Sequence, residues 1–590
     1  MVSAETLCYT TQRNRPIRNA HLDYLQLNCA AKSTRSLLFA LLGSAAMAAH
    51  GAAALMEHVQ GYTLAGDRLQ SFTALVFDSG KVIETGASED LRKRHPDATV
   101  IDGEGRCLLP GLIDAHGHVF DLGFDAVQIQ LADTRSLGEA QSRIRAYAAA
   151  HRAQAWLSGD GWNQVKWNLG RFPYASELDA AVPDRPAVLS RVDGHAEWLN
   201  TRALQAAGIT KDTADPPGGR IERDGAGNPS GVLVDKAMEL VNRVVPQPTD
   251  AERRAALTAA LAHMNLVGLT GVGDAGVDAR RLAIYREFAD RGLLSVRVYA
   301  MILGTGDDFA VLSKSGPLLG YGDDRLTIRS VKLFADGALG SRGAALLAPY
   351  SDMPSQQGLL FMSDAEMRGK IATALEAGYQ VNIHAIGDAA NHQALDAFEA
   401  AYKLVGGRQL RNRIEHAQVV ALSDIPRFKQ LDLIASMQPT HATSDMNMAE
   451  DRIGRERLKG AYAWRTFLDQ GTRIAGGSDF PVESDNPFFG LHAAVTRQDH
   501  AGDPPGGWHP EQAMTLLEAF RAFTLDAAYA EHHEQTIGSL EPGKWADFIL
   551  VDRDLFKIPP SEIWKIAVEE TWVGGKRVYA RSSSHGRGKQ

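Results

Sequence analysis

Short apolar runs and amphipathic helical patterns alternate along the middle of the chain. Helical patterns include "TDAERRAALTAALAHMNLVG" and "SDAEMRGKIATALEAGYQ". The apolar runs predict buried strands, and they read "SVRVYAMI", "RSVKLFADG", "QVNIHAIGD", "RIEHAQVV", "LIASMQP" and "TRIAGGSD". Strands that alternate with helices at this spacing are typical of βα units around a parallel sheet. We therefore predict an α/β fold, a (β/α)8 TIM-type barrel over residues 110–533.

The regions on either side of this barrel have a different pattern, one of short strands with glycine-rich turns. "SFTALVFDSGKVIETGA" breaks at Ser79 and Gly80 as a hairpin does, and "GSLEPGKWADFILVDRD" has the same character. We predict that residues 58–109 and 534–582 form one small β-sandwich domain, followed by a tail at 583–590. Residues from about 120 to 250 have few βα repeats, and we predict an insertion over the barrel mouth.

The first part of the chain has the features of an export signal. Residues 32–54, "KSTRSLLFALLGSAAMAAHGAAA", combine a basic flank, an apolar stretch and small residues suited to cleavage. We expect a leader over residues 1–57 and a periplasmic or secreted mature protein without a stable membrane span. The segment before it is long for a signal, which favours a translation start downstream of Met1. A membrane anchor or a buried helix is the alternative.

Charge and cysteine content exclude several classes of partner and site. The net charge of −9 over 590 residues gives no electrostatic reason to expect nucleic acid or an anionic membrane. The cysteines are Cys8, Cys29 and Cys107, and the first two precede the expected cleavage site. A mature chain then has no internal disulfide and no cysteine metal site. Cys107 directly precedes an apolar strand, so we expect it in the core.

Side chains that bind metals stand where the predicted strands end. His116 and His118 in "LLPGLIDAHGH" are one residue apart, so they point to the same face of a strand. The other strands end at Lys332, His384, His416 and Asp479. In a barrel of this type the carboxyl ends of the strands surround one mouth. Histidines and a carboxylate gathered there favour Zn²⁺ or a similar divalent ion.

Lys332 is an unexpected neighbour for a dication, because both are positively charged. A lysine that burial and nearby cations have neutralised can react with carbon dioxide, and the resulting carbamate can bridge two metals. Structural alternatives exist: Lys332 in an ion pair, His416 as a hydrogen-bonded core residue, and Asp479 as a helix cap. The metal site is favoured because all the residues fall at strand ends in one alternating frame.

Several longer strings occur in a fixed order along the chain. They include "LLPGLIDAHGH", "GDGWNQVKW", "SRVDGHAEWLNTRAL", "FADGALGSRGAAL", "MQPTHATSD", "GSDFPV" and "GSLEPGKWADFILVD". Together with the strand-end residues, these strings resemble the amidohydrolase superfamily and, within it, amidohydrolase family 3, the YtcJ-like metal-dependent hydrolases. The resemblance covers about residues 60–582. It implies a (β/α)8 barrel, a small β-sandwich built from both terminal segments, and a divalent metal centre of one or two ions, zinc being expected.

The resemblance also implies roles for the strand-end residues. His116, His118 and Asp479 would hold one ion, His384 and His416 a second, and carbamylated Lys332 would bridge them. The implied reaction is hydrolysis of C–N bonds in amides, formamides or N-acyl compounds by metal-activated hydroxide, with Asp479 transferring the proton. A small amide-type molecule is the expected substrate. A homodimer is expected, and no nucleic acid is implied.

Five further residues are candidate substrate contacts: Trp162, His195, Arg342, His441 and Asp445. Each lies in one of the quoted strings. Structural interpretations stand beside these: Trp162 as a core residue, Asp445 as a helix cap and Arg342 as a loop anchor.

Other functions compete with amide hydrolysis. A cyclic amide or lactone hydrolase, or a deaminase, would use the same ligand set. A non-catalytic binding protein on the same fold is a different class of alternative. The complete ligand set argues against it, because such a protein needs neither Asp479 nor Lys332.

Overall fold

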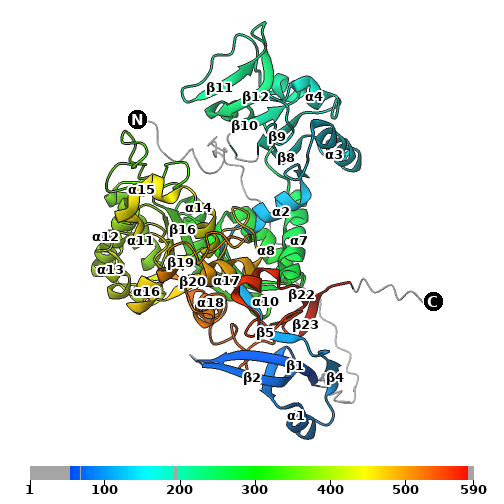
Figure 1. Cartoon of the computed structure of the whole chain (residues 1–590), viewed down its shortest axis with the longest axis vertical. Helices are drawn as coiled ribbons and strands as arrows, with labels where there is room; N and C mark the ends of the chain where they lie inside the picture. The colour runs from blue at the N-terminus through cyan, green and yellow to red at the C-terminus, as the bar shows by residue number, and fades with distance from the viewer. Residues whose placement is uncertain (1–52, 67, 192–193, 195, 583–590) are drawn as a thin grey trace, which may run out of the picture.

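Eight parallel strands form a nearly closed barrel, which confirms the predicted fold class (Figure 1). The computed structural model describes residues 53–66, 68–191, 194 and 196–582. The barrel strands are β6 (Leu112–Gly117), β13 (Leu269–Val277), β14 (Arg297–Leu303), β16 (Leu326–Phe334), β17 (Gln380–Ala385), β18 (Arg413–His416), β19 (Ile434–Met437) and β20 (Ile474–Gly476). Beyond the last strand, the Asp479 N–H donates to the His116 carbonyl at 2.7 Å and the His118 N–H to the Phe480 carbonyl at 2.8 Å. These bonds join β20 to β6 and close the ring.

Helices surround the barrel and bury one large apolar core against it. They include α2 (Val119–Val127), α7 (Asp250–Leu266), α8 (Ala279–Asp290), α9 (Asp307–Leu312), α10 (Tyr321–Asp324), α11 (Asp364–Glu376), α12 (Asp388–Val405), α13 (Ile425–Gln430), α14 (Pro439–Asp445), α15 (Ala449–Leu458), α16 (Trp464–Asp469), α17 (Pro487–Thr496), α18 (Leu516–Ala522) and α19 (Leu525–Ala530). Reciprocal capping boxes begin α7 at Thr249 and α11 at Ser363. The polar residues at the start of both quoted helical patterns thus fix where these helices begin.

A second sheet combines segments from both sides of the barrel. Its strand order is β23-β22-β21-β5-β1-β2-β3, with β4 paired to β1. The strands are β1 (Ala54–Ala65), β2 (Arg68–Asp78), β3 (Lys81–Gly86), β4 (Thr99–Asp102), β5 (Cys107–Pro110), β21 (Phe548–Val551), β22 (Val568–Val573) and β23 (Lys576–Ala580), and α1 (Ser88–Arg94) packs beside them. Antiparallel β5 and β21 join the two segments. Of the leader predicted over residues 1–57, all but the last five residues lie outside the described part, and β1 begins at Ala54.

A third sheet is inserted between α2 and α7. Its order is β11-β12-β10-β9-β8-β7. The strands are β7 (Ile129–Gln130), β8 (Leu157–Trp162), β9 (Ala187–Arg191), β10 (Ala196–Leu199), β11 (Gly219–Arg223) and β12 (Pro229–Asp235), with helices α3 (Leu137–Ala150), α4 (Ala175–Asp179), α5 (Thr201–Ala206) and α6 (Glu239–Asn242). In Figure 1 this sheet stands at the top, beyond α2 and α7. In the described part of the chain, no helix combines the length and apolar character needed to cross a membrane.

One buried ion pair ties the barrel to the terminal sheet. Arg297, the first residue of β14, donates from Nε to Asp547 Oδ2 at 2.6 Å and from Nη2 to Asp547 Oδ1 at 3.0 Å. Their side chains are 2% and 4% exposed. Asp547 directly precedes β21 and also accepts the Gly574 N–H at 2.7 Å. Because both charges are removed from water, neither tolerates loss of the other.

Asp547→Asn should lower the free energy of unfolding by about 3–5 kcal/mol, because it leaves the buried Arg297 guanidinium without a counter-charge. Urea-induced unfolding followed by tryptophan fluorescence measures this change. The control is Glu450→Gln, which breaks a largely exposed pair with Arg455 and should leave the midpoint unchanged. Equal effects of the two substitutions would contradict the assignment.

Cys107 should be unreactive in the folded protein. Its side chain is buried in β5, and burial raises the pKa of its thiol to about 12, so almost no thiolate exists at pH 8. In a Cys8→Ser, Cys29→Ser variant, a thiol-specific chromogenic reagent should label no cysteine under native conditions and one equivalent in denaturant. Rapid native labelling would show that this strand opens readily.

Candidate metal centre

The six residues predicted as metal ligands lie together at the carboxyl end of the barrel. Four of them belong to barrel strands, one directly precedes a helix and one follows the last strand. They are His116 in β6, Lys332 in β16, His384 in β17, His416 in β18, His118 immediately before α2, and Asp479 three residues beyond β20. The parallel sheet brings them to one place although they span more than 360 positions of the chain.

The donor atoms of these residues converge on a small volume. Asp479 Oδ1 lies 3.1 Å from His118 Nε2 and 3.4 Å from His116 Nε2. The Lys332 ammonium lies 2.9 Å from His116 Nε2. Ligand atoms of His116, His416 and Asp479 all lie within 4.8 Å of one another. The His384 and His416 rings are 4.5 Å apart between centroids, so the fourth histidine adjoins the same group.

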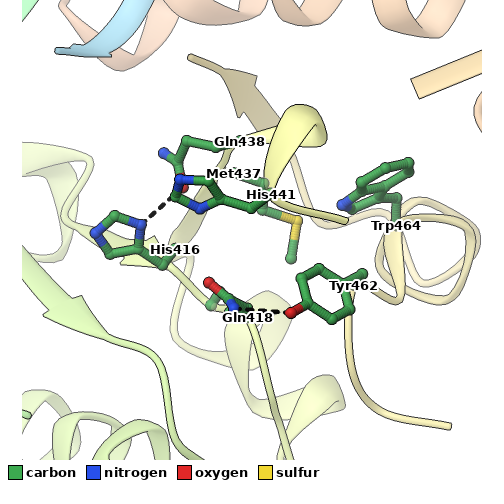
Figure 2. Close-up of a pocket in the computed structure, with 8 residues that line it drawn as sticks. His416, Gln418, Met437, Gln438, His441, Tyr462 and Trp464 are labelled. Atoms are coloured by element: carbon green, nitrogen blue, oxygen red, sulfur yellow. Dashed lines mark hydrogen bonds between the residues drawn. The ribbon is translucent and has the colours of Figure 1, made fainter. Parts of the chain in front are cut away.

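Hydrogen bonds to the far ring nitrogens orient three of the histidines. His116 Nδ1 donates to Glu415 Oε2 at 2.5 Å, and His118 Nδ1 donates to the Ala275 carbonyl at 2.9 Å. His416 Nδ1 donates to Gln438 Oε1 at 2.8 Å (Figure 2). Because Nδ1 carries the proton in each ring, the Nε2 lone pair faces the centre. Metal-binding histidines are held in this way.

Burial and neighbouring groups keep three of the candidate ligands, His384, His416 and Asp479, in the ionisation states that a metal requires. Burial, together with the nearby charge of Lys332, lowers the pKa of His384 to about 3. Burial and the adjacent His384 lower the pKa of His416 well below its usual range. Burial would raise the pKa of Asp479, but the adjacent His116 and His118 side chains hold it well below its ordinary value. His384 and His416 are therefore neutral imidazoles, and Asp479 is an ionised carboxylate. At His118 burial acts in the same direction, but the adjacent Asp479 carboxylate outweighs it and raises the pKa of the ring.

These residues fit a divalent cation. His384 Nε2 is buried and has no hydrogen-bond partner among the described residues. A buried ring nitrogen without a partner is unfavourable unless it serves as a ligand. Imidazole nitrogens beside a carboxylate are ligands that Zn²⁺ and similar ions accept.

The backbone is left-handed at two of the converging residues. His416 has φ of 72° and Asp479 has φ of 64°, values that cost non-glycine residues about 1–3 kcal/mol each. Strict strand alternation would point Glu415 and His416 to opposite faces. The turn at His416 instead allows Glu415 to contact His116 while His416 faces the same centre.

Two of the candidate substrate contacts lie at or near the centre. His441 stacks on His416 with 5.8 Å between ring centroids, and its Nε2 lies 3.7 Å from Asp479 Oδ2. Asp445 accepts hydrogen bonds from the Tyr462 hydroxyl at 2.6 Å and from Gln418 Nε2 at 2.9 Å. His441, Gln418 and Tyr462 line one cavity of about 10 Å³. Figure 2 shows these side chains around it.

Of the other three candidates, Trp162 and Arg342 have different contacts, and the third is not among the described residues. Trp162 is completely buried in the core of the inserted sheet, where its indole N–H donates to the Leu189 carbonyl at 2.7 Å. This complete burial agrees with the core interpretation of Trp162. Arg342 pairs with Asp352 at 2.8 Å and anchors the loop after β16. His195 lies outside the described residues.

Sequence reasoning missed several side chains that support the ligands. Glu415 and Gln438 accept the histidine protons, and Arg413 donates from Nε to Glu415 Oε1 at 2.8 Å. Asp114 accepts the His116 N–H at 3.0 Å and the Ser478 hydroxyl at 2.6 Å. The sequence signal that could have identified these supporting residues is the presence of polar residues inside otherwise apolar strands, as in "RIEH" and "LIDAH".

Comparisons with known proteins support this description. The family model described as "Amidohydrolase family" matches residues 99–579. The chain is 33% identical to the Bacillus subtilis (strain 168) protein YtcJ, which is named as an amidohydrolase, over 88% of this chain and 97% of YtcJ. It is 30% identical to the N-substituted formamide deformylase of Arthrobacter pascens, over 87% and 95% of the two chains.

A solved structure shows the same architecture. The uncharacterized metal-dependent hydrolase of Pyrococcus horikoshii OT3 superposes with a TM-score of 0.72 at 28% identity, covering 86% of this chain and 99% of that one. The family model and the relatives span the barrel and the candidate ligands together. The chain therefore belongs to the amidohydrolase family and is a hydrolase.

Proposed function

We propose that this protein hydrolyses C–N bonds of small amide-type molecules, namely amides, formamides or N-acyl compounds, with a divalent metal, zinc being the expected ion. The observation that carries the proposal is the convergence of His116, His416 and Asp479 ligand atoms within 4.8 Å. His118, His384 and Lys332 would complete the ligand set. Lys332, buried beside His116 Nε2, would serve as a carbamate rather than as a buried ammonium, which is costly.

A bound divalent ion would supply activation of a water molecule and polarisation of the substrate carbonyl. The protein's own residues orient the reactants and move the proton. Asp479 presents Oδ1 to His116 and His118 and Oδ2 to His441. Its ionised carboxylate would accept the proton of the attacking water at Oδ2 and return it to the leaving nitrogen. His441 would orient the substrate beside that oxygen.

Two observations bear on the substrate. The Arthrobacter pascens relative is named an N-substituted formamide deformylase and aligns over almost its whole length, which supports an open-chain formamide. Cyclic amides are the second candidate, because an imidazolonepropionase of Porphyromonas gingivalis is 28% identical over 40% of this chain. The deformylase aligns over more of this chain and at higher identity than the imidazolonepropionase, which favours a formamide substrate.

We also propose that the protein is exported and forms a homodimer. The export signal predicted over residues 32–54 supports the first proposal, and family resemblance supports the second. Cell fractionation tests export, and retention of the whole protein in the cytoplasm would reject it. Light scattering tests dimerisation, and a monomeric mass would reject it.

The metal content of the purified protein tests the centre. Wild type should bind one or two equivalents of divalent metal by elemental analysis, and Lys332→Ala should lose at least half of it if the carbamate bridges two ions. Lys403→Ala changes a largely exposed lysine and is the matched control. Bound metal that Lys332→Ala leaves unchanged would make Lys332 structural. Absence of metal in reconstituted wild type would reject the proposed function.

Substitution of Asp479 tests the proton transfer. Asp479→Asn should lower kcat by about 10²–10⁴-fold, the usual contribution of a general acid–base group. The assay is formation of a free amino group from N-substituted formamides, N-acyl amines and cyclic amides, with formamides hydrolysed fastest. Asp396→Asn, at an exposed helix position, should retain wild-type activity. Full activity of Asp479→Asn would contradict the assigned role.

A further inference from the structure

In two of the converging histidines, the ring nitrogen that faces away from the centre has a chemically different hydrogen-bond partner. His116 Nδ1 donates to the carboxylate of Glu415, whereas His416 Nδ1 donates to the neutral amide of Gln438. Both partners are buried, at 0% and 3% exposure, so solvent does not screen the difference. A carboxylate partner raises the basicity of an imidazole and strengthens it as a ligand, and a neutral partner does so less.

The Gln438 amide is held in one orientation. Its Nε2 donates to the Ser436 carbonyl at 3.3 Å, which leaves Oε1 facing His416. Gln438 also stands immediately before α14, the helix that carries His441. Figure 2 shows its side chain beside His441, with Oε1 bonded to His416. The amide thus fixes both the tautomer and the direction of the His416 ring.

The distribution of charge around the centre has the same asymmetry. On the His116 side, Asp479 Oδ1 lies within 3.4 Å of both His116 and His118. On the other side, Asp336 Oδ1 is 3.5 Å from His384 Nε2. Backbone N–H groups of Ala345, Ile386 and Gly387 already bind the oxygens of Asp336. The Asp336 carboxylate is therefore already used to hold the loops that follow β16 and β17.

We propose that the metal centre is unequal: an ion on the His116 side is bound more tightly than one on the His416 side, and Gln438 is the positioning residue that sets the weaker affinity. The inference rests on the proposed metal centre and goes beyond it. It assigns the difference in metal affinity to Glu415 and Gln438, which act through His116 and His416 and are not proposed as ligands.

The test measures zinc affinity rather than turnover. Metal-free wild type, Gln438→Met and Gln438→Glu are titrated with Zn²⁺ in competition with a chromophoric chelator. Methionine keeps the length of glutamine but removes the acceptor, and glutamate keeps an acceptor. Thermal unfolding of each metal-free variant checks the fold.

Wild type should show two classes of site that differ at least tenfold in affinity. Gln438→Met should weaken only the weaker class, by about 10–100-fold, the usual effect of losing such a partner. Gln438→Glu should bind at least as tightly as wild type in that class. Glu415→Gln should weaken the tighter class by a similar factor. If loss of the Arg413 counter-charge unfolds that variant, the two Gln438 variants carry the test alone.

Each other outcome has a definite meaning. Equal affinities in wild type, or weakening of the tighter class by Gln438→Met, would overturn the inference and leave the proposed function intact. A single class of site in wild type, whether or not Gln438→Met changes it, would also overturn the inference, because no weaker class would exist for Gln438 to set. No zinc binding by wild type would overturn the proposed function itself.

Discussion

The closure of the barrel between β20 and β6 is the constraint on which the candidate site depends. Two backbone hydrogen bonds, from Asp479 to His116 and from His118 to Phe480, join segments that are far apart in the chain. They require close approach at Gly477, where an added Cβ would lie 2.8 Å from the His116 nitrogen. Any larger residue there would push the last strand away from the first. The glycines before Asp479 are thus part of the ligand geometry.

Buried charge supports this geometry more than it stabilises the fold. Arg413 and Glu415 form a fully buried pair behind His116. The charge of Arg413 and the hydrogen bond from His116 hold the pKa of Glu415 at about 2 in spite of burial. Replacing such a pair by apolar residues is often neutral or stabilising, so its presence is weak evidence for stability. Its value here lies in orienting the ring of His116.

Strand alternation and chain order made much of the architecture predictable. The βα pattern was enough for the barrel, and the one-residue spacing of His116 and His118 was enough to place both on one face. Glu415 escaped prediction because its neighbour His416 has a left-handed backbone, which alternation does not anticipate. Trp162 was ambiguous for another reason. An aromatic side chain suits a pocket wall and a core equally, and only burial separates the two.

The terminal sheet has a consequence for synthesis of the protein. Because β5 pairs with β21, the edge of β5 has its partner only after more than 430 further residues have been made. Until then a strand of four buried residues, Cys107–Pro110, has no antiparallel neighbour on that side. An unpaired strand edge is a site for mispairing and aggregation. A chaperone, or rapid completion of translation, would protect this edge while the barrel forms.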